Sequence, residues 1–359
     1  MIWKSILVTP NIFGKDGVSA LSREMARALA APVLILSLHD ASLPADQSPL
    51  GIEVRGASGS RTALLMAAVR VGRGAALIST IACSHLHLAP IARAIALIAG
   101  RGVTPAVVLC GIEAWVPLRP LERWALSASE VTAISRYTID RFKTANPRMR
   151  SMDISVCHPG LAAASVSAVE RPRASSTSAL IVARMSAAER YKGHDALLDI
   201  WPRILERHPG AVLTIAGDGD DRPRLEARAR QQNVPGAVQF LGRVSDAALA
   251  ELYGQCRFFV MPSSDEGFGL VFLEAMRAAK PCIGGAGAAG EIIDHGVTGL
   301  VVEPGNRQQI AAAIARLYDE PETCAQFGAA GRERFLSMFT DRHFQARFAQ
   351  IITHRTVAA

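Results

Sequence analysis

Two successive series of alternating strand and helix patterns constrain the fold of this chain more than any other feature. In the first series, short apolar runs at 5–9, 33–37, 75–79 and 106–110 are separated by stretches whose apolar residues recur at helical spacing. A segment at 166–178, rich in Ser, Ala, Arg and Pro, shows neither pattern, and a second series of the same kind follows it. Such alternation predicts two parallel sheets, each covered by helices on both faces.

The same patterns predict how the 359 residues divide into domains. We expect an N-terminal domain over 1–165, a linker over 166–178 and a C-terminal domain over 179–338. The tail over 339–359 is expected to form a C-terminal helix that returns to the N-terminal domain. Two doubly wound, Rossmann-like α/β domains in sequence are expected to face a central cleft, because such folds bind ligands at the carboxyl ends of their strands.

The net charge of +7 lies entirely in the first half of the chain. Residues 1–168 hold 17 Lys and Arg against 10 Asp and Glu, whereas residues 169–359 hold 22 of each kind. A basic half beside a neutral half suggests an anionic partner, and an ordinary arginine-rich composition is the alternative. We expect no nucleic-acid binding, because no recognition motif and no basic strand with interleaved aromatic residues accompanies the charge.

The location of the protein and the state of its cysteines are predicted from what the sequence lacks. Its first ten residues lack the charged, apolar and cleavage-site segments of a secretory signal, and Arg93 interrupts the longest apolar run, near 86–100. We therefore expect a cytoplasmic protein without a membrane span. The six cysteines have no paired spacing and no histidines at zinc-ligand distance, which predicts reduced thiols and no metal site.

The densest motif runs from Pro262 to Met276, where an apolar run ends and a helical pattern begins. Its glycines allow close approach of the backbone to a ligand, and free N–H groups at a helix start suit a diphosphate. Glu274, further along this helix, could accept hydrogen bonds from both hydroxyls of a ribose. Glu266, just before the helix, could bind sugar hydroxyls or stabilise positive charge on a ring carbon.

Two glutamates separated by seven residues resemble the signature of family 4 retaining glycosyltransferases of the GT-B fold, and the resemblance covers nearly the whole chain. It continues in Arg184 and Lys192, which are similar to the family's Arg and Lys that bind the donor diphosphate. The resemblance implies that Glu266, Arg184 and Lys192 are catalytic. It also implies a set of donor-binding residues: Gly17, Gly217, Gly267, Phe268, Gly269, Leu270, Val271 and Glu274.

A finer resemblance lies in the segments 107–115 and 135–138. They are similar to mannosyltransferases that act on polyprenyl-diphosphate-linked sugars in exopolysaccharide assembly, whose first motif reads His-Gly-Ile-Glu-x-Trp. Cys110 stands where that His would stand. His85 and His87 are candidates to supply an imidazole instead, and ordinary structural histidines are the alternative. The acceptor-side candidates are His85, His87, Cys110, Glu113 and Trp115.

The resemblance implies retaining transfer of a sugar to a lipid-linked oligosaccharide or polysaccharide-precursor acceptor, with no cofactor and no metal. It favours GDP-mannose as the donor over a UDP-sugar. The resemblance also implies front-face attack, in which the acceptor hydroxyl approaches from the side that the nucleoside diphosphate leaves. The departing diphosphate then takes the proton of that hydroxyl. The helical stretches 60–71 and 88–99 mix Leu, Ile and Ala with Arg, which suits either peripheral contact with an anionic membrane at its inner face or a core position.

Other functions remain open at the level of sequence. A nucleotide-sugar epimerase of the same fold would bind a similar donor, and Cys110 also allows a non-catalytic nucleotide-sugar-binding protein. Asp218-Gly-Asp220 matches the Asp-x-Asp metal motif of other glycosyltransferases, but we interpret it as a turn with a helix cap. Gly285 to Gly290 matches a dinucleotide fingerprint, yet it lies far from the first strand of its domain, which disfavours a dehydrogenase.

Overall fold

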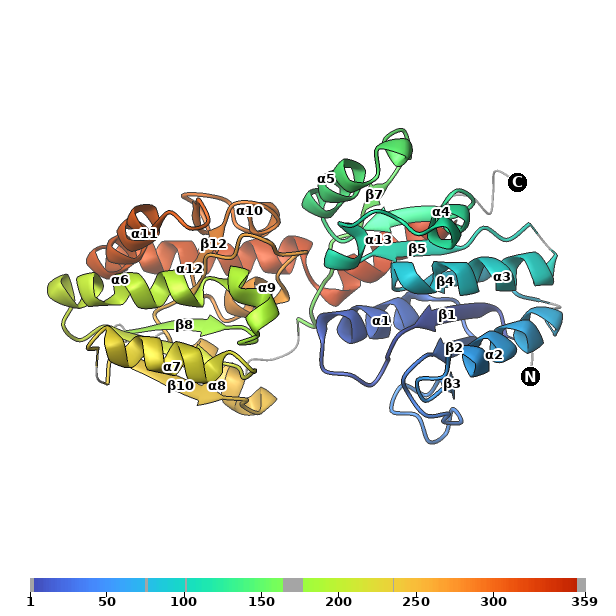
Figure 1. Cartoon of the computed structure of the whole chain (residues 1–359), viewed down its shortest axis with the longest axis horizontal. Coiled ribbons are helices and arrows are strands. Elements are labelled where there is room, and N and C mark those ends of the chain that lie inside the picture. The colour runs from blue at the N-terminus through green and yellow to red at the C-terminus, as the bar shows by residue number, and fades with distance from the viewer. Residues whose placement is uncertain (1–2, 75–76, 101, 164–176, 235, 354–359) are drawn as a thin grey trace. The chain divides into compact units, whose positions relative to one another are not determined.

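The computed structural model divides the chain into two compact units, which are described separately (Figure 1). Unit 1 comprises Met1–Gly160 with Asp341–Ala359, and unit 2 comprises Leu161–Thr340. The expected linker at 166–178 lies outside the described residues, except for Thr177 and Ser178. The structure describes residues 3–74, 77–100, 102–163, 177–234 and 236–353.

Unit 1 is built on a seven-stranded sheet with the order β3-β2-β1-β4-β5-β6-β7, and all neighbouring strands are parallel. β1 and β2 are buried along their whole length, as expected for parallel strands that are covered on both faces. The strands are β1 Ser5–Thr9, β2 Val33–Ser37, β3 Glu53–Gly56, β4 Thr80–Cys83, β5 Ala106–Leu109, β6 Glu130–Ala133 and β7 Ser155–Val156.

The helices of unit 1 fall into two groups. α2 (Arg61–Arg73), α3 (Ala89–Ala99) and α4 (Pro120–Leu126) pack in sequence, and their buried residues join one apolar core with the sheet. α1 (Gly17–Ala28) contacts α13 (Asp341–Thr353), whose buried Phe344 and Phe348 rings stack. The remaining elements are α5 Arg136–Ala145, η1 Leu86–Leu88, η2 Ile112–Ala114 and η3 Pro147–Met149.

Unit 2 is built on a six-stranded parallel sheet with the order β10-β9-β8-β11-β12-β13. Its strands are β8 Ser178–Val182, β9 Val212–Ala216, β10 Val238–Gly242, β11 Phe258–Met261, β12 Cys282–Gly285 and β13 Gly299–Val302. Its helices are η4 Ala187–Lys192, α6 His194–Arg207, α7 Arg222–Gln231, α8 Asp246–Gln255, α9 Leu270–Arg277, α10 Ala289–Ile292, α11 Arg307–Asp319 and α12 Pro321–Met338. Large buried side chains, such as Trp201, Phe258 and Phe272, fill the core.

Each sheet has one point at which the direction of strand addition reverses, between β1 and β4 in unit 1 and between β8 and β11 in unit 2. At such a point the connections leave the sheet toward opposite faces, so a crevice forms at the carboxyl ends of the two strands. The prediction of two doubly wound α/β domains is therefore confirmed. The topology also predicts a ligand site at the carboxyl ends of β1 and β4 in unit 1 and of β8 and β11 in unit 2.

The strand expected at 75–79 is displaced in the structure. Residues 75–76 lie outside the described residues, and β4 forms at Thr80–Cys83, where Ser5 of β1 pairs with Thr80. Leu77 instead lies in the connection and is 57% exposed. The apolar run extends from 75 to 83, and hydrophobicity alone does not state which part of a continuous run pairs with the neighbouring strand.

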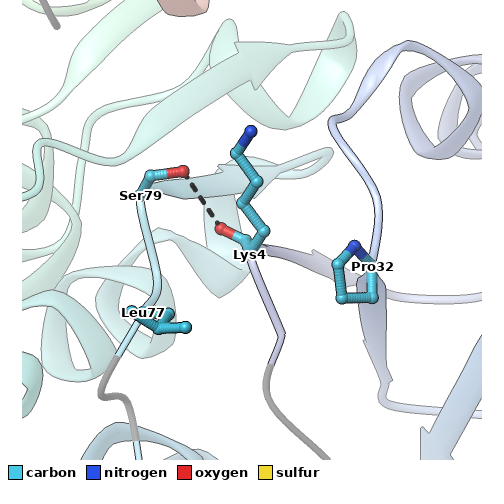
Figure 2. A pocket seen from close by; sticks show the side chains of 4 residues that line it. All are labelled: Lys4, Pro32, Leu77 and Ser79. Carbon is cyan, nitrogen blue, oxygen red and sulfur yellow. Dashed lines mark hydrogen bonds between the residues drawn. The ribbon is translucent and has the colours of Figure 1, made fainter.

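A cavity of about 310 Å³ opens in unit 1 at the end of the sheet opposite to the carboxyl ends of its strands (Figure 2). It is lined by Lys4, Pro32, Leu77 and Ser79, and the Ser79 hydroxyl donates to the Lys4 carbonyl oxygen at 3.3 Å. These residues precede β1, β2 and β4, so the cavity lies at the amino edge of the sheet. It is therefore separate from the crevice that the topology predicts.

Gly217, which follows β9, generates a prediction about stability. It has φ +134°, and an added Cβ would lie 2.0 Å from the carbonyl oxygen of Ala183. We expect Gly217→Ala to lower the free energy of unfolding by at least about 3 kcal/mol, because backbone must move to relieve the contact.

The matched control is Gly254→Ala, within α8, where an added Cβ meets no atom within 4 Å. This control should raise stability by about 0.5–1 kcal/mol, since Ala favours helix. Urea denaturation of both variants measures the difference, and equal midpoints would contradict the prediction.

Candidate active site

Two loops of unit 2 meet where β8 and β11 end. The N–H of Ser264 donates to the carbonyl oxygen of Tyr191 at 3.0 Å. Gly193 has φ +94°, and an added Cβ would lie 2.8 Å from the ring of Pro262. Only glycine combines this backbone conformation with so close an approach. The loop that carries Lys192 is therefore fixed against the loop that carries Glu266.

Lys192 and Glu266 form an ion pair between these loops. Lys192 Nζ lies 2.6 Å from Glu266 Oε2, and the two side chains are only 15% and 18% exposed. The ammonium also lies 5.2 Å from the centre of the Tyr191 ring. The structure thus brings two of the three predicted catalytic residues into contact at the switch point of the sheet. There they offer a cation to an anionic ligand and a carboxylate to hydroxyl groups.

Arg184, the third predicted catalytic residue, follows β8 but pairs with a different acid. Its Nη2 lies 2.6 Å from Glu189 Oε1 and its Nε lies 3.2 Å from Glu189 Oε2. The Arg184 side chain is 69% exposed and that of Glu189 is 16% exposed, and a pair with one partner in solvent contributes about 1 kcal/mol. Exchange of Glu189 for a phosphate group would therefore cost little. Glu189 has no signal in the sequence that marks it as this partner.

The start of α9 supplies backbone donors beside the ion pair. Gly269 precedes the helix with φ +99°, and no side chain caps the N–H groups of the first turn, which begins with Leu270 and Val271. Uncapped N–H groups at a helix start favour anions. Gly267 lies on the approach to this turn. Phe268 is buried, and its ring centre lies 6.1 Å from that of Phe339, so its side chain packs within unit 2.

Glu274 is engaged by a partner that the sequence analysis missed. The hydroxyl of Tyr253, on α8, donates to Glu274 Oε2 at 2.8 Å. Burial raises the pKa of Glu274, and the hydrogen bond from Tyr253 opposes that shift only in part. One carboxyl oxygen is therefore occupied, which limits the expected contact with both ribose hydroxyls. No spacing in the sequence links Tyr253 to this glutamate.

The glycine turns of unit 2 have structural causes of their own. An added Cβ on Gly219 would lie 2.0 Å from the carbonyl oxygen of Met185, and one on Gly285 would lie 2.0 Å from that of Ser263. Asp220 Oδ1 accepts from the N–H of Ala187 at 3.1 Å, so the Asp-x-Asp sequence ties two turns together. The interpretation as a turn is correct. The expected helix cap is wrong, because α7 begins after Asp221 and no side chain caps it.

In unit 1, the acceptor-side candidates gather after β4 and β5. His87 Nδ1 lies 2.8 Å from Glu122 Oε1, and the N–H of His87 donates to His85 Nδ1 at 3.2 Å. Burial lowers the pKa of His85 to about 4, and the neighbouring His87 acts in the same direction. His85 is therefore a neutral imidazole at neutral pH. Glu122, which fixes His87, was not predicted, because it lies 35 residues further along the chain.

Cys110 and Glu113 are bound to each other through the backbone. Glu113 Oε1 accepts from the N–H of Cys110 at 2.6 Å, and the Cys110 thiol donates to the carbonyl oxygen of Ser84 at 3.0 Å. Burial raises the pKa of Cys110 well above its ordinary value, with Glu113 next in effect, and burial also raises the pKa of Glu113. The thiol is thus a neutral donor and not a nucleophilic thiolate. All six cysteines are free thiols.

Trp115 joins the two segments that carry the finer resemblance. Its ring meets the edge of the Tyr137 ring at 5.6 Å between centres, and the guanidinium of Arg141 lies 4.8 Å from its centre. Ser135 caps α5 by accepting from the N–H of Thr138 at 3.0 Å. The segments 107–115 and 135–138 therefore contact each other.

Gly17 lies at the start of α1, after the loop that follows β1. Asn11 Oδ1 accepts from the N–H groups of Phe13 and Gly14, at 3.0 and 2.8 Å. An added Cβ on Gly14 would lie 2.5 Å from Ser19 Oγ, so a larger residue here would displace the side chains that form the loop. Gly17 itself is exposed as the first residue of the helix. Arg23 and Asp40, which also hold this loop, have no signal in the sequence.

Two kinds of structural feature are absent from the described residues. In that part of the chain, no group of three or more His, Cys, Asp and Glu side chains is arranged to hold a metal ion. None of the helices described is both long enough and apolar enough to cross a membrane.

One family model matches a region within unit 2. Residues 169–334, which include the Lys192–Glu266 pair and Glu274, match the family model described as glycosyl transferases group 1. This region of unit 2 is therefore similar to group 1 glycosyl transferases. The solved structures extend the likeness to nearly the whole chain, at identities that show the fold alone. Anabaena HepE in complex with UDP and glucose has a TM-score of 0.78 at 18% identity, covering 98% of this chain and 100% of that one.

A second structure, sucrose-phosphate synthase from Thermosynechococcus elongatus, has a TM-score of 0.78 at 19% identity and covers 99% of this chain and 100% of that one. The chain therefore has the GT-B fold. Glycogen synthase of Mycobacterium tuberculosis is 35% identical over 186 residues, 51% of this chain and 44% of that protein. The chain thus spans less than half the length of this relative.

A GDP-mannose-dependent alpha-(1-6)-phosphatidylinositol monomannoside mannosyltransferase of Mycobacterium tuberculosis is 37% identical over 150 residues, 40% of this chain and 39% of that protein. The protein of the same name from Mycolicibacterium smegmatis is 29% identical over 268 residues, 69% of each chain.

The raised pKa of Glu274 predicts how stability depends on pH. A carboxyl group whose pKa is higher in the folded state favours folding while it is protonated, and this contribution is lost as the pH rises through the folded pKa. Glu274→Gln imitates the protonated form and keeps an acceptor for Tyr253. We therefore expect the variant to be more stable than the wild type at about pH 8, with the difference shrinking toward about pH 4.

Thermal unfolding across this pH range measures the difference between the two proteins. Glu251→Gln, at an exposed position of α8, controls for loss of charge alone. A difference for Glu274→Gln that grows toward low pH would contradict the prediction.

Proposed function

We propose that this protein is a retaining glycosyltransferase that moves mannose from GDP-mannose to a lipid-linked or polysaccharide-precursor acceptor. The observation that carries the proposal is the Lys192–Glu266 ion pair at the β8–β11 switch point of unit 2. The pair lies within residues 169–334, which are similar to group 1 glycosyl transferases. The names of two relatives, both GDP-mannose-dependent mannosyltransferases of phosphatidylinositol mannosides, support the donor and the lipid character of the acceptor. A UDP-sugar is the alternative donor.

In this proposal the donor diphosphate replaces the two glutamates that pair with Lys192 and Arg184. Lys192 turns from Glu266 to the phosphate oxygens, and Arg184 exchanges Glu189 for the same group. The uncapped N–H groups at the start of α9 bind the diphosphate from its other side. These groups stabilise the negative charge that develops on the diphosphate as its bond to the sugar breaks.

The release of Lys192 leaves Glu266 free to act on the sugar. Its carboxylate accepts hydrogen bonds from sugar hydroxyls and stabilises positive charge on the reacting ring carbon. The acceptor hydroxyl attacks from the face that the diphosphate leaves, its proton passes to the departing phosphate, and the configuration is retained. Glu274 binds a ribose hydroxyl through the carboxyl oxygen that Tyr253 does not engage. Gly17, at the start of α1, remains a candidate for donor contact.

On the acceptor side, we propose that His85 supplies the imidazole that Cys110 cannot. The thiol is neutral and donates to the carbonyl oxygen of Ser84. The half-buried His85 is neutral at physiological pH, and its Nδ1 accepts from the N–H of His87, so its Nε2 carries the proton and can donate a hydrogen bond to the acceptor. His87 is held by Glu122 and positions the backbone beside His85. Glu113 and Trp115 shape the same side of unit 1.

Thermal shift with nucleotide sugars tests the donor. GDP-mannose at about 100 times its Kd should add about 2.7 kcal/mol of stability, and UDP-glucose at the same concentration should add little. Stabilisation by uridine nucleotides alone would replace GDP-mannose with a UDP-sugar. Stabilisation without release of GDP in the presence of any acceptor would favour the non-catalytic alternative, and a product that is still nucleotide-linked would favour the epimerase.

Removal of either cation tests the catalytic assignment. We expect Lys192→Ala and Arg184→Ala each to lower kcat/KM for donor consumption by about 100-fold or more, because leaving-group charge loses its counter-charge. Arg203→Ala, an exposed arginine on α6, is the matched control and should leave turnover unchanged. Wild-type turnover in both cation variants would contradict the assignment.

Substitution of the two histidines separates their roles. His85→Ala should reduce transfer to the acceptor by about 100-fold, while donor binding measured by thermal shift stays unchanged. His87→Ala should have a smaller effect, since His87 acts through the backbone contact with His85. Normal transfer by His85→Ala would contradict the proposal that His85 supplies the imidazole.

A further inference from the structure

The outer faces of α2, α3 and α4 expose large apolar side chains. The three helices pack side by side, while their inner faces fill the core of unit 1. An added Cβ on Gly72 would lie 2.8 Å from the side chain of Ile98, so the backbone of α2 touches the exposed part of α3. We define the apolar face as six exposed residues of these helices: Leu65, Met66, Leu97, Ile98, Leu121 and Trp124.

The exposure of this face is large for side chains of this kind. Met66 is 56% exposed, Leu97 is 55% exposed and Leu121 is 66% exposed. Among the described residues, nine of the thirteen exposed large apolar side chains belong to unit 1. Single exposed apolar residues are ordinary, but a group of them on adjacent helices marks a surface that binds a partner.

The charge around the apolar face has one sign. Residues 54–112, a stretch of 59, contain six arginines and no aspartate or glutamate. Arg61, Arg70 and Arg73 are exposed on α2. The sole acid within α4 is Glu122, which is buried and pairs with His87. The partner must therefore combine an apolar layer with negative charge.

We propose that the apolar face and the α2 arginines form a docking surface for a membrane that contains anionic lipids. Leucine, isoleucine and methionine side chains would enter the boundary between headgroups and acyl chains, while arginines contact the headgroup phosphates. Trp124, at 43% exposure, is the residue type that favours this boundary. A second copy of the chain fits less well, because two identical basic faces repel each other, and a nucleic acid would leave the apolar side chains in water.

This surface lies outside the donor site and adds to the proposed function the place where a lipid-linked acceptor would be met. Flotation of the full chain with phosphatidylcholine vesicles, with and without about one third phosphatidylglycerol, tests it in the absence of donor and acceptor. We expect binding only to the anionic vesicles. Arg70→Gln/Arg73→Gln should weaken binding by about 30-fold at low salt, and the difference should shrink at high salt.

Leu97→Ser/Trp124→Ser should weaken binding at least about tenfold at every salt concentration, since it removes apolar burial. The matched control is Leu241→Ser/Leu336→Ser, two exposed leucines of unit 2, which should bind as the wild type does. Donor turnover with a water-soluble acceptor, measured on every variant, should be unchanged and shows that each variant is folded.

Absence of wild-type flotation with anionic vesicles would overturn the inference, and so would equal binding by all variants. Concentration-dependent self-association that the face variants abolish, without vesicle binding, would assign the face to a second copy instead. Vesicle binding by a protein that turns over no nucleotide sugar would overturn the proposed function and leave this inference standing.

Discussion

The candidate site depends on the contact between two backbone segments of unit 2. Gly193 can approach Pro262 only because it has no side chain, and the hydrogen bond from Ser264 to Tyr191 holds the segments at that distance. Lys192 and Glu266, 74 residues apart in the chain, reach each other as a result. Parallel pairing of β8 with β11 places both segments at the same edge of the sheet. The proposed reaction at the site thus depends on a packing contact between residues that take no part in that reaction.

The strands whose limits could be predicted are those that correspond to a single, isolated apolar run in the sequence. The limits of β1, β2, β9 and β11 agree with the runs seen in the sequence, because a proline, a glycine or a charged residue marks at least one end of each run. Five strands were missed, since short strands with polar or glycine residues have no clear period: β3, β6, β7, β12 and β13. β4 was misplaced within a run that was too long to define a register.

The candidate site shows the same division between local and distant information. Lys192, Glu266 and Glu274 were found because they belong to motifs that are continuous in sequence. Tyr253 and Glu122 were missed because each lies more than twenty residues from the side chain that it binds, and only the fold brings the pairs together. Burial also changed the meaning of residues that were identified correctly. Cys110 and His85 are both neutral groups in their surroundings, which the sequence did not state.

The position of α13 has a consequence for how the chain acquires its structure during synthesis. Phe344 and Phe348 are buried in unit 1, although the whole of unit 2 lies between them and the rest of that unit in the sequence. At ordinary translation rates, unit 2 takes on the order of ten seconds to be made. During that interval unit 1 has all its strands but lacks the helix that covers α1. On the ribosome, unit 2 can therefore complete its fold before unit 1 does, and an early-exposed apolar surface is where chaperones would act.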